Sequence, residues 1–345
     1  MRALVLTATG GLDGLAVADL PRPGPPAAGW VTLQIRAVAL NRLDLFVASG
    51  IPGAAPVLPH IVGADGAGVV VEVGPGVTAV KPGDEVIFDP GISCGDCAAC
   101  QADDAPFCTT YQILGEHRHG SAAEFVQLPA VNLAPRPAGW SWTEAAGFSL
   151  AALTAWRMMV SRARLRAGET VLVWGAGGGV AQMCIGIAKH LGACVIATSS
   201  TADKLALARR LGADDVLDHS TADVVAEVKR LTGRKGCQVV VDNVGEATWE
   251  RSLRSLARGG RVVSCGATSG PAASFDLRRL FWHQWSILGS TMGSRSEYRA
   301  VAALAQQGLL RPVIDTVVPL DRAIDAFRRL HSGAQAGKLA IEVTT

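Results

Sequence analysis

The pattern of apolar and polar positions changes near residue 150 and divides the chain into two parts. Before residue 150, short apolar runs such as VTLQIRAVAL (31–40) and GAGVVVEVG (66–74) are separated by turn sequences rich in glycine and proline. Apolar runs of this length between such turns are typical of β-strands. The first part is therefore expected to be a compact, mostly β domain.

From about residue 170 to residue 290 the pattern becomes strand, turn and helix, repeated. Strands that alternate with helices predict a parallel, doubly wound sheet, so the fold class is α/β. The tail, 317–343, adds one amphipathic helix and one more strand. The expected strands are TVLVW, CVIAT, DVLD, QVVVD, RVVSC and SILGS, and the expected helices cover about 180–191, 203–212, 221–233 and 247–260.

Composition and charge limit the class of partner. With 345 residues, of which 49% are hydrophobic, the chain is long enough for two domains with separate cores. Its formal net charge of +2 argues against nucleic acid or an anionic membrane and favours a small-molecule substrate. No run reaches the roughly 18 apolar residues of a membrane span, and the first residues lack the pattern of a signal peptide. We expect a cytoplasmic protein with reduced thiols.

The sequence VLVWGAGGGVAQMCIGIAKHLGA (171–193) joins an apolar strand, a glycine-rich turn and an amphipathic helix. Glycines let the backbone turn tightly and approach a pyrophosphate at the helix N-terminus, where free N–H groups face the anion. Gly175 and Gly178, with Ala181 at the close-packing position, fit this pattern. Because the turn opens a series of strand and helix units, the sequence predicts a dinucleotide site.

The end of the second strand of this series predicts which dinucleotide binds. In folds that prefer NAD, an acidic side chain there bonds the ribose 2′-hydroxyl. Here Thr198, Ser199 and Ser200 stand at that place, and Lys204 follows. Hydroxyls and an ammonium accept a 2′-phosphate that a carboxylate would repel. NADP(H) is therefore the predicted cofactor.

Four cysteines, Cys94, Cys97, Cys100 and Cys108, are separated by two, two and seven residues. Four thiolates complete a tetrahedron around zinc and leave no position for water or substrate, so the sequence predicts one structural Zn²⁺ per chain. The other four cysteines, Cys184, Cys194, Cys237 and Cys265, lie on or beside apolar elements and are expected to be small core side chains.

Taken together, these features resemble the medium-chain dehydrogenase/reductase superfamily of zinc alcohol dehydrogenases and quinone oxidoreductases. The resemblance covers nearly the whole chain and is carried by PHIVGADGAGVVVEVGPGVTAVKPGDEV, EAAGFSLAALTAW, GAGGGVA, GRVVSCGATSG and GKLAIEV. It implies a GroES-like catalytic domain at 1–150 and 290–345, with the zinc lobe at 91–112, and a Rossmann NADP-binding domain with a six-stranded sheet at 151–289. It also implies a homodimer or homotetramer built through the edge of the Rossmann sheet.

The zinc alcohol dehydrogenases of this superfamily hold a catalytic zinc with three side chains. The corresponding positions in this chain are Asn41, Ala64 and Leu150, and Asp65 stands in place of a neighbouring glutamate. Alanine and leucine have no side-chain ligand atom, so the resemblance implies that there is no catalytic zinc.

The sequences NRLD (41–44) and GAD (63–65) are instead similar to the quinone oxidoreductase and ene-reductase branch, which works without zinc. That branch transfers a hydride from NADPH to an electron-poor carbon of an enone, a quinone or an enoyl thioester. Such a reduction requires stabilisation of an enolate, which hydrogen-bond donors can supply, whereas alcohol oxidation produces an alkoxide suited to a Lewis-acid metal. The chain combines the residues of this branch with a cysteine lobe typical of the zinc enzymes.

Four residues are candidates for catalysis. Asn41 is expected to donate a hydrogen bond to a substrate carbonyl, and Asp65 stands at the position of the family's glutamate. His117 and His119 are expected to lie in an extended strand, and one of them is a candidate proton donor because imidazole titrates near neutrality. The alternative is that both histidines are structural. Asp44 is expected to be a structural hydrogen-bond acceptor.

The resemblance also implies contacts with the cofactor. Thr154 matches a threonine near the nicotinamide, and Lys338 lies in the terminal GK sequence. Further candidates lie in the pyrophosphate turn or at the ends of strands, where ligands bind in open α/β sheets. They are Gly175, Gly178, Gly179, Val180, Ser199, Ser200, Lys204, Asn243, Gly266, Ala267, Leu288, Gly289 and Ser290.

Three functions remain open at this point. The first is an NADP(H)-dependent oxidoreductase that reduces an activated C=C bond or a quinone. The second is an alcohol dehydrogenase or carbonyl reductase that works without catalytic zinc. The third is a dinucleotide-binding sensor without turnover.

Overall fold

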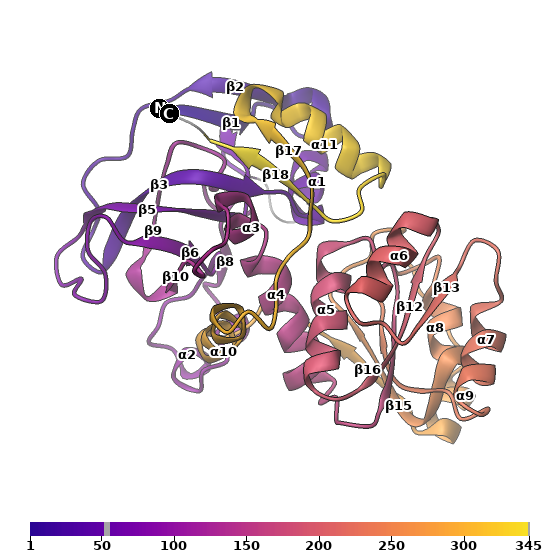
Figure 1. Ribbon diagram of the computed structural model, residues 1–345. Helices are drawn as coiled ribbons and strands as arrows, with labels where there is room; N and C mark the ends of the chain where they lie inside the picture. The colour runs from indigo at the N-terminus through magenta and orange to yellow at the C-terminus, as the bar shows by residue number, and fades with distance from the viewer. Residues whose placement is uncertain (52–55, 344–345) are drawn as a thin grey trace. The chain divides into compact units, whose positions relative to one another are not determined.

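The computed structural model describes residues 1–51 and 56–343, and its contacts divide the chain into two compact units (Figure 1). Unit 1 comprises Met1–Leu153 and Gly293–Thr345, and unit 2 comprises Thr154–Met292. Among the described residues, no helix has the length and apolar character needed to span a bilayer.

Unit 1 contains three sheets. The strands are β1 (Arg2–Leu6), β2 (Leu15–Asp19), β3 (Trp30–Ala39), β4 (His60–Ile61), β5 (Asp65–Val73), β6 (Glu85–Phe88), β7 (Gly91–Ile92), β8 (Gln112–Ile113), β9 (Phe125–Pro129), β10 (Leu133–Pro135), β17 (Ile314–Pro319) and β18 (Lys338–Glu342). The main sheet has the order β10-β6-β5-β3-β18-β17, and β9 also pairs with β3. Strands β2, β1 and β4 form a second sheet, and β7 pairs with β8.

Both ends of the chain build the core of unit 1, because β18 inserts beside β3. In β3, Val31, Leu33 and Ile35 are buried on alternate positions, and Phe327 and Ile341 from the C-terminal segment join the same cluster. Such alternation is what a strand with one face on the core requires. The two strands run antiparallel, with Ala340 opposite Ala39.

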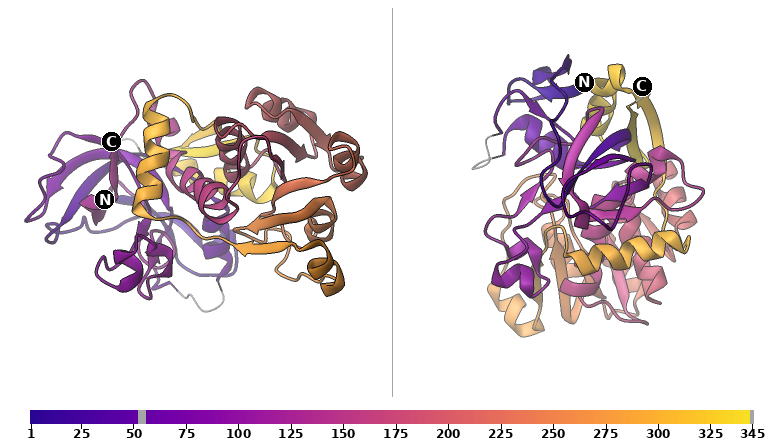
Figure 2. Two further views of the ribbon diagram at one scale, coloured as in Figure 1. Left: turned by 90° about the horizontal axis from the view of Figure 1, so that it is seen from below. Right: turned by 90° about the vertical axis from the view of Figure 1, so that its left-hand side faces the viewer.

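The helices of unit 1 flank its sheets. They are α1 (Arg42–Ser49), α2 (Ala98–Gln101), α3 (Trp142–Ala146), α4 (Ser149–Trp156, which crosses into unit 2), α10 (Arg295–Gln306) and α11 (Ala323–Ser332), with short 3₁₀ turns at Leu12–Gly14, Ala105–Phe107, Ala130–Asn132 and Leu320–Arg322. Helix α10 lies beside α2 of the cysteine lobe, on the other side of unit 1 from α11 (Figure 2). Helix α10 was not expected from the sequence, although Ser294 and Glu297 form a capping box at its start.

Unit 2 is a six-stranded parallel sheet, as predicted. Its strands are β11 (Thr170–Val173), β12 (Cys194–Ser199), β13 (Asp215–Asp218), β14 (Cys237–Val241), β15 (Leu256–Ser264) and β16 (Ser286–Gly289), and a π-helix covers Arg157–Arg162. The order is β13-β12-β11-β14-β15-β16. Helices α5 (Gly179–His190) and α6 (Ala202–Arg210) cover one face, while α7 (Val224–Leu231) and α8 (Trp249–Ser255) cover the other, and α9 (Leu277–His283) precedes β16.

Two expectations for unit 2 were wrong. The helix expected over 247–260 ends at Ser255, because Leu256 pairs with Cys237 of β14 and begins β15 with a register shift. Of the four cysteines expected in the core, Cys184 and Cys237 are buried, but Cys194 is exposed and Cys265 is half-buried. Cys194 is the first residue of β12, and the pairing with β13 begins only two residues later, at Ile196.

Candidate active site

Three neighbouring strands of unit 1 bring Asn41, Asp65 and Lys338 together. Asp65 begins β5 opposite Ala39 at the end of β3, and Lys338 begins β18, in which Ala340 also lies opposite Ala39. In an antiparallel pair, the residue two positions before Ala340 faces the residue two positions after Ala39. Lys338 therefore meets Asn41, although 297 positions separate them in the sequence.

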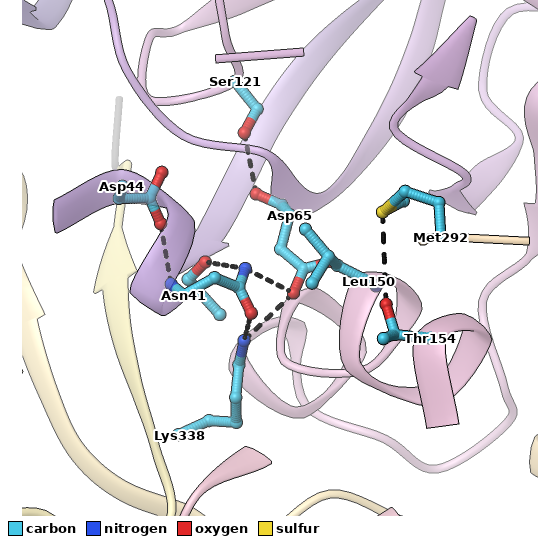
Figure 3. A network of polar contacts seen from close by, with 9 residues as sticks. Asn41, Asp44, Asp65, Ser121, Leu150, Thr154, Met292 and Lys338 are labelled. Carbon is cyan, nitrogen blue, oxygen red and sulfur yellow. Dashed lines mark hydrogen bonds and ion pairs between the residues drawn. The ribbon is translucent and has the colours of Figure 1, made fainter. Parts of the chain in front are cut away.

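The three side chains form one hydrogen-bonded network (Figure 3). Lys338 Nζ donates to Asn41 Oδ1 at 2.6 Å and to Asp65 Oδ2 at 3.0 Å. Asn41 Nδ2 donates to Asp65 Oδ2 at 3.0 Å and more weakly to the Ala39 carbonyl at 3.4 Å. The second oxygen of Asp65, Oδ1, accepts the backbone N–H of Leu150 at 2.7 Å.

The network is buried, so its charges have to compensate each other. Asp65 is 0% exposed and Lys338 is 3% exposed. A charge removed from water to this extent is stable only when it is paired and its remaining hydrogen bonds are satisfied. The Asp65 carboxylate meets this requirement with an ammonium, an amide and a backbone N–H as donors.

Two further residues hold the network in place. The Asn41 backbone N–H donates to Asp44 Oδ2 at 2.6 Å in the capping box of α1, and Ser121 Oγ donates to the Asp65 carbonyl at 2.7 Å. Burial raises the pKa of the Asp44 carboxyl to about 6, although the hydrogen bond from the Asn41 backbone opposes this shift. Asp44 is thus a structural acceptor, in agreement with the sequence analysis.

The sequence assigned Lys338 to the cofactor, but the structure places its ammonium between Asn41 and Asp65. One of its two acceptors, Asn41, stands at a position that, by the resemblance, holds a zinc ligand in the zinc alcohol dehydrogenases. The side-chain amide of Asn41 donates its hydrogens to Asp65 Oδ2 and to the Ala39 carbonyl. Lys338 has three N–H donors and uses two of them on acceptors within the described residues.

His117 and His119 lie outside this network. Residues 115–117 form a turn, so the expected extended strand was wrong. His117 Nδ1 accepts the Ile113 backbone N–H and His119 Nδ1 accepts the Ile61 backbone N–H, both at 3.2 Å. Burial lowers the pKa of His119. Both rings are fixed by a hydrogen bond from a backbone N–H, which favours the structural alternative for both residues.

The four cysteines of the lobe form a cluster in which all Sγ atoms lie within 4.8 Å of one another. The Sγ atoms of Cys97 and Cys100 are 3.5 Å apart, those of Cys94 and Cys108 are 3.5 Å apart, and those of Cys94 and Cys100 are 3.8 Å apart. Thiolates at the corners of a tetrahedron about 2.3 Å from zinc lie about 3.8 Å from each other. The cluster therefore fits a closed, four-thiolate zinc site.

In unit 2, the glycine-rich turn has the geometry that a dinucleotide requires. Gly175 has φ of 69° in the left-handed region, and Gly178 is the N-cap of α5 without a side chain to cap the helix. The first N–H groups of α5 therefore face the turn, as they do in pyrophosphate sites. Trp174 Nε1 and Ser290 Oγ, just beyond the carboxyl ends of β11 and β16, are buried without a hydrogen-bond partner among the described residues. Such orphaned polar atoms at this edge fit a bound dinucleotide.

The other predicted cofactor residues lie along the same edge of the sheet. The loop after β14 is held by Asp242, whose carboxylate accepts hydrogen bonds from the backbone of Val244 and Gly245 and from the hydroxyls of Thr248 and Ser252. Thr154 Oγ1 contacts Met292 Sδ at 4.0 Å. At the ends of their strands or in the adjoining turns lie Ser199, Ser200, Asn243, Gly266, Ala267, Leu288 and Gly289, whereas Gly179 and Val180 are the first residues of α5.

A cluster of basic side chains lies near the carboxyl end of β12, and of these only Lys204 was expected from the sequence. The aliphatic chain of Lys204 crosses the glycine turn, since a Cβ on Gly177 would lie 2.7 Å from Lys204 Cδ. His219 follows β13, and the Arg251 guanidinium lies 4.9 Å from the centre of the Trp174 ring. The His219 ring centre lies 5.8 Å from that of the same Trp174 ring, so His219 and Arg251 are close to one another. Burial lowers the pKa of His219, and the charges of Arg251 and Lys204 lower it further. His219 directly follows a predicted strand, and this position could have indicated it as a candidate ligand-binding residue.

Two family models match the chain. The alcohol dehydrogenase GroES-like domain matches residues 27–138, and the zinc-binding dehydrogenase model matches residues 179–307. Together with the two units described above, these matches define a dehydrogenase with a GroES-like domain and a Rossmann domain.

Full-length relatives identify the family. A NAD-dependent alcohol dehydrogenase of Sulfolobus acidocaldarius is 30% identical over 351 residues, with 100% of both chains covered. An acryloyl-coenzyme A reductase of Metallosphaera sedula is 29% identical, with 99% of both chains covered. A crystal structure of a NAD-dependent alcohol dehydrogenase has a TM-score of 0.96 and 46% identity, with 100% of both chains covered. The chain belongs to the medium-chain dehydrogenase/reductase superfamily and is a zinc-type alcohol dehydrogenase-like oxidoreductase.

Proposed function

We propose that this chain is an NADP(H)-dependent reductase of activated C=C bonds, in enones or enoyl thioesters, or of quinones, and that it works without a catalytic zinc. The observation that carries this proposal is the buried network of Asn41, Asp65 and Lys338. The name of the acryloyl-coenzyme A reductase relative agrees with an enoyl thioester as substrate.

The network supports a mechanism without catalytic zinc, because the oxygen atoms that could bind a metal already accept hydrogen bonds from the protein. Both oxygens of Asp65 accept hydrogen bonds, and one of them is paired with the Lys338 ammonium. A zinc ion here would have to displace these donors and would be repelled by the ammonium. Ala64 and Leu150 offer no side-chain ligand in return.

The same network supplies a donor for the reaction. When bound, NADPH provides the hydride that adds to the electron-poor carbon of the acceptor. Negative charge then develops on the acceptor's oxygen, and a fixed donor aimed at that oxygen stabilises it. We assign this role to the third N–H of Lys338, while Asn41 orients the ammonium. This assignment replaces the expectation that the Asn41 amide donates to the substrate.

Turnover assays test the reaction class directly. With NADPH, the protein is expected to reduce crotonyl-CoA, an enone or a quinone faster than it oxidises simple alcohols with NADP⁺. The opposite ratio would favour alcohol oxidation, the function named for the Sulfolobus acidocaldarius relative. Binding of NADPH without turnover of any of these compounds would favour a sensor.

The proposal includes a preference for NADPH over NADH, through a contact between Lys204 and the 2′-phosphate. Lys204→Ala is expected to weaken NADPH binding by about 10- to 100-fold, because a hydrogen bond to a charged group contributes roughly 1.5–3 kcal/mol. NADH lacks the 2′-phosphate, so its dissociation constant should change less than about twofold. Fluorescence titration measures both constants, and the exposed Lys235→Ala is the control. Equal weakening of both cofactors would contradict a 2′-phosphate contact at Lys204.

We also propose a homodimer or homotetramer built through β16. This strand is at an edge of its sheet, and Phe281, Trp282 and Ile287 beside or on it expose 67%, 65% and 38% of their surface. An apolar edge strand of this kind pairs readily with another copy. Ile287→Lys is expected to yield monomers by sedimentation velocity, whereas Leu309→Lys, at an exposed position of unit 1, should not. An unchanged mass for Ile287→Lys would refute this interface.

A further inference from the structure

His219 is fixed beside the place where the 2′-phosphate of NADP(H) is proposed to bind. Its backbone N–H donates to the carbonyl of Ser199, the last residue of β12, at 2.9 Å. Its Nδ1 lies 3.0 Å from Thr198 Oγ1, and its ring centre lies 5.8 Å from that of Trp174. The described part of the chain provides no hydrogen-bond partner for Nε2. The imidazole is therefore held at the strand end with one nitrogen available.

Burial and nearby positive charges favour the neutral form of the His219 ring in the free protein. Burial is the largest cause that lowers the pKa of His219, and the positive charge of Arg251 on α8 lowers it further. Lys204 on α6 acts in the same direction, whereas Asp218, its neighbour in the chain, raises the pKa. Two further side chains contact the ring, Trp174 directly after β11 and Thr198 of β12, and neither carries a charge.

We infer that His219 takes up a proton from solvent when the 2′-phosphate of NADP(H) binds, so that coenzyme preference at this site depends on pH. This inference rests on the proposed NADP(H) preference. A 2′-phosphate carries close to two negative charges at neutral pH, and it would enter a cluster that contains Lys204, Arg251 and His219. An anion close to imidazole favours the imidazolium form.

The proton balance of this step is simple. The proton comes from buffer and adds to the free ring nitrogen, and no covalent bond between heavy atoms forms or breaks. In the protonated ring both nitrogens are donors. Nδ1–H then donates to Thr198 Oγ1, and Nε2–H donates to a phosphate oxygen. NADH has only a 2′-hydroxyl at this place and provides no charge to stabilise the imidazolium.

Linkage fixes the direction of the pH dependence. Free His219 has a pKa below the usual 6.5, and the bound phosphate raises it, so uptake occurs at pH values between the free and bound pKa. Within that window NADPH affinity falls as pH rises, because the site must bind a proton together with the ligand. Below the free pKa the ring is already charged, and uptake declines toward zero.

Isothermal titration calorimetry measures this uptake without turnover. NADPH and NADH are titrated separately into the full-length protein at pH 7.5, in buffers with different enthalpies of ionisation such as Pipes and Tris. The dependence of the observed heat on the buffer gives the number of protons bound. We expect about 0.3 to 1 proton per chain for NADPH and no uptake for NADH.

Two variants identify the group that is protonated. His219→Gln keeps a polar side chain without a titratable ring, and it should abolish the NADPH-specific uptake. His190→Gln, at an exposed position at the end of α5, is the matched control and should leave the uptake unchanged. Equal affinity for NADH and NADPH in the wild-type protein would overturn both the cofactor proposal and this inference. Tighter NADPH binding with no uptake, or with uptake that persists in His219→Gln, would overturn this inference alone.

Discussion

Lys338→Met is expected to lower the free energy of unfolding by about 3–5 kcal/mol, because it leaves a buried carboxylate without its counter-ion. Asp65 is 0% exposed and cannot recover the lost interaction from water. Methionine fills much of the volume of the lysine chain, so the loss reports the charge rather than a cavity. Urea denaturation of the purified variant measures the change.

A double variant separates the charge from other effects of the substitution. Asp65→Asn combined with Lys338→Met removes both charges and retains an oxygen to accept the Leu150 N–H, so most of the lost stability should return. The exposed pair Arg311 and Glu144 is the matched control. Arg311→Met should cost at most about 1 kcal/mol. A loss for Lys338→Met as small as this would show that the network does not stabilise unit 1.

The same variants distinguish a structural lysine from a catalytic one. If Lys338 donates to the substrate, the double variant should fold and bind NADPH but reduce an enone about 10²- to 10³-fold more slowly, the cost of removing one such donor. A purely structural role predicts that activity returns together with stability. Lys338→Arg keeps the charge but changes the donor geometry, so its kcat should lie between those of the wild type and the double variant.

Local pattern was sufficient to predict the architecture of unit 2 and the cysteine lobe. The six parallel strands are short apolar runs with helices between them, so the chain's periodicity carries the information. The spacing of Cys94, Cys97, Cys100 and Cys108 likewise places four thiols on one short segment, and the structure brings them together. Where local preferences were ambiguous, as at Leu256–Gly260, pairing with β14 decided the outcome.

The candidate site in unit 1 could not be predicted in the same way, because it depends on the register between distant strands. Lys338 and Asp65 are 273 positions apart, and only the insertion of β18 beside β3 brings them into contact. The sequence identified Asn41 and Asp65 by their positions and not by what they contact. The expected contact of Lys338 with the cofactor stays a prediction, and the structure adds that its ammonium completes the network of Asn41 and Asp65.

Cys97→Ser is expected to remove the zinc proposed for the lobe and to loosen that part of unit 1. The lobe at 91–112 buries few apolar side chains, which are Ile92, Ala105 and Cys108. A segment with so little core depends on metal ligation for its order. Zinc content, measured by mass spectrometry, should fall from about one per chain to near zero. Cys194→Ser, outside the cluster, should retain the metal.

Loss of order in the lobe should also destabilise the start of α10, because Asp103 of the lobe contacts it. This carboxylate accepts hydrogen bonds from Ser294 Oγ at 2.9 Å and from Ser296 Oγ, and a longer one from the Ser296 backbone N–H at 3.4 Å, at the start of α10. Losing three such bonds costs about 3 kcal/mol, so the Tm of Cys97→Ser should fall by roughly 8 °C. Hydride transfer per folded chain should persist, because the four thiolates leave no position for substrate. Full zinc content in Cys97→Ser would contradict the assignment of Cys97 as a zinc ligand. Loss of turnover in its folded fraction would contradict a purely structural site, since a closed metal centre orders the lobe without taking part in the reaction.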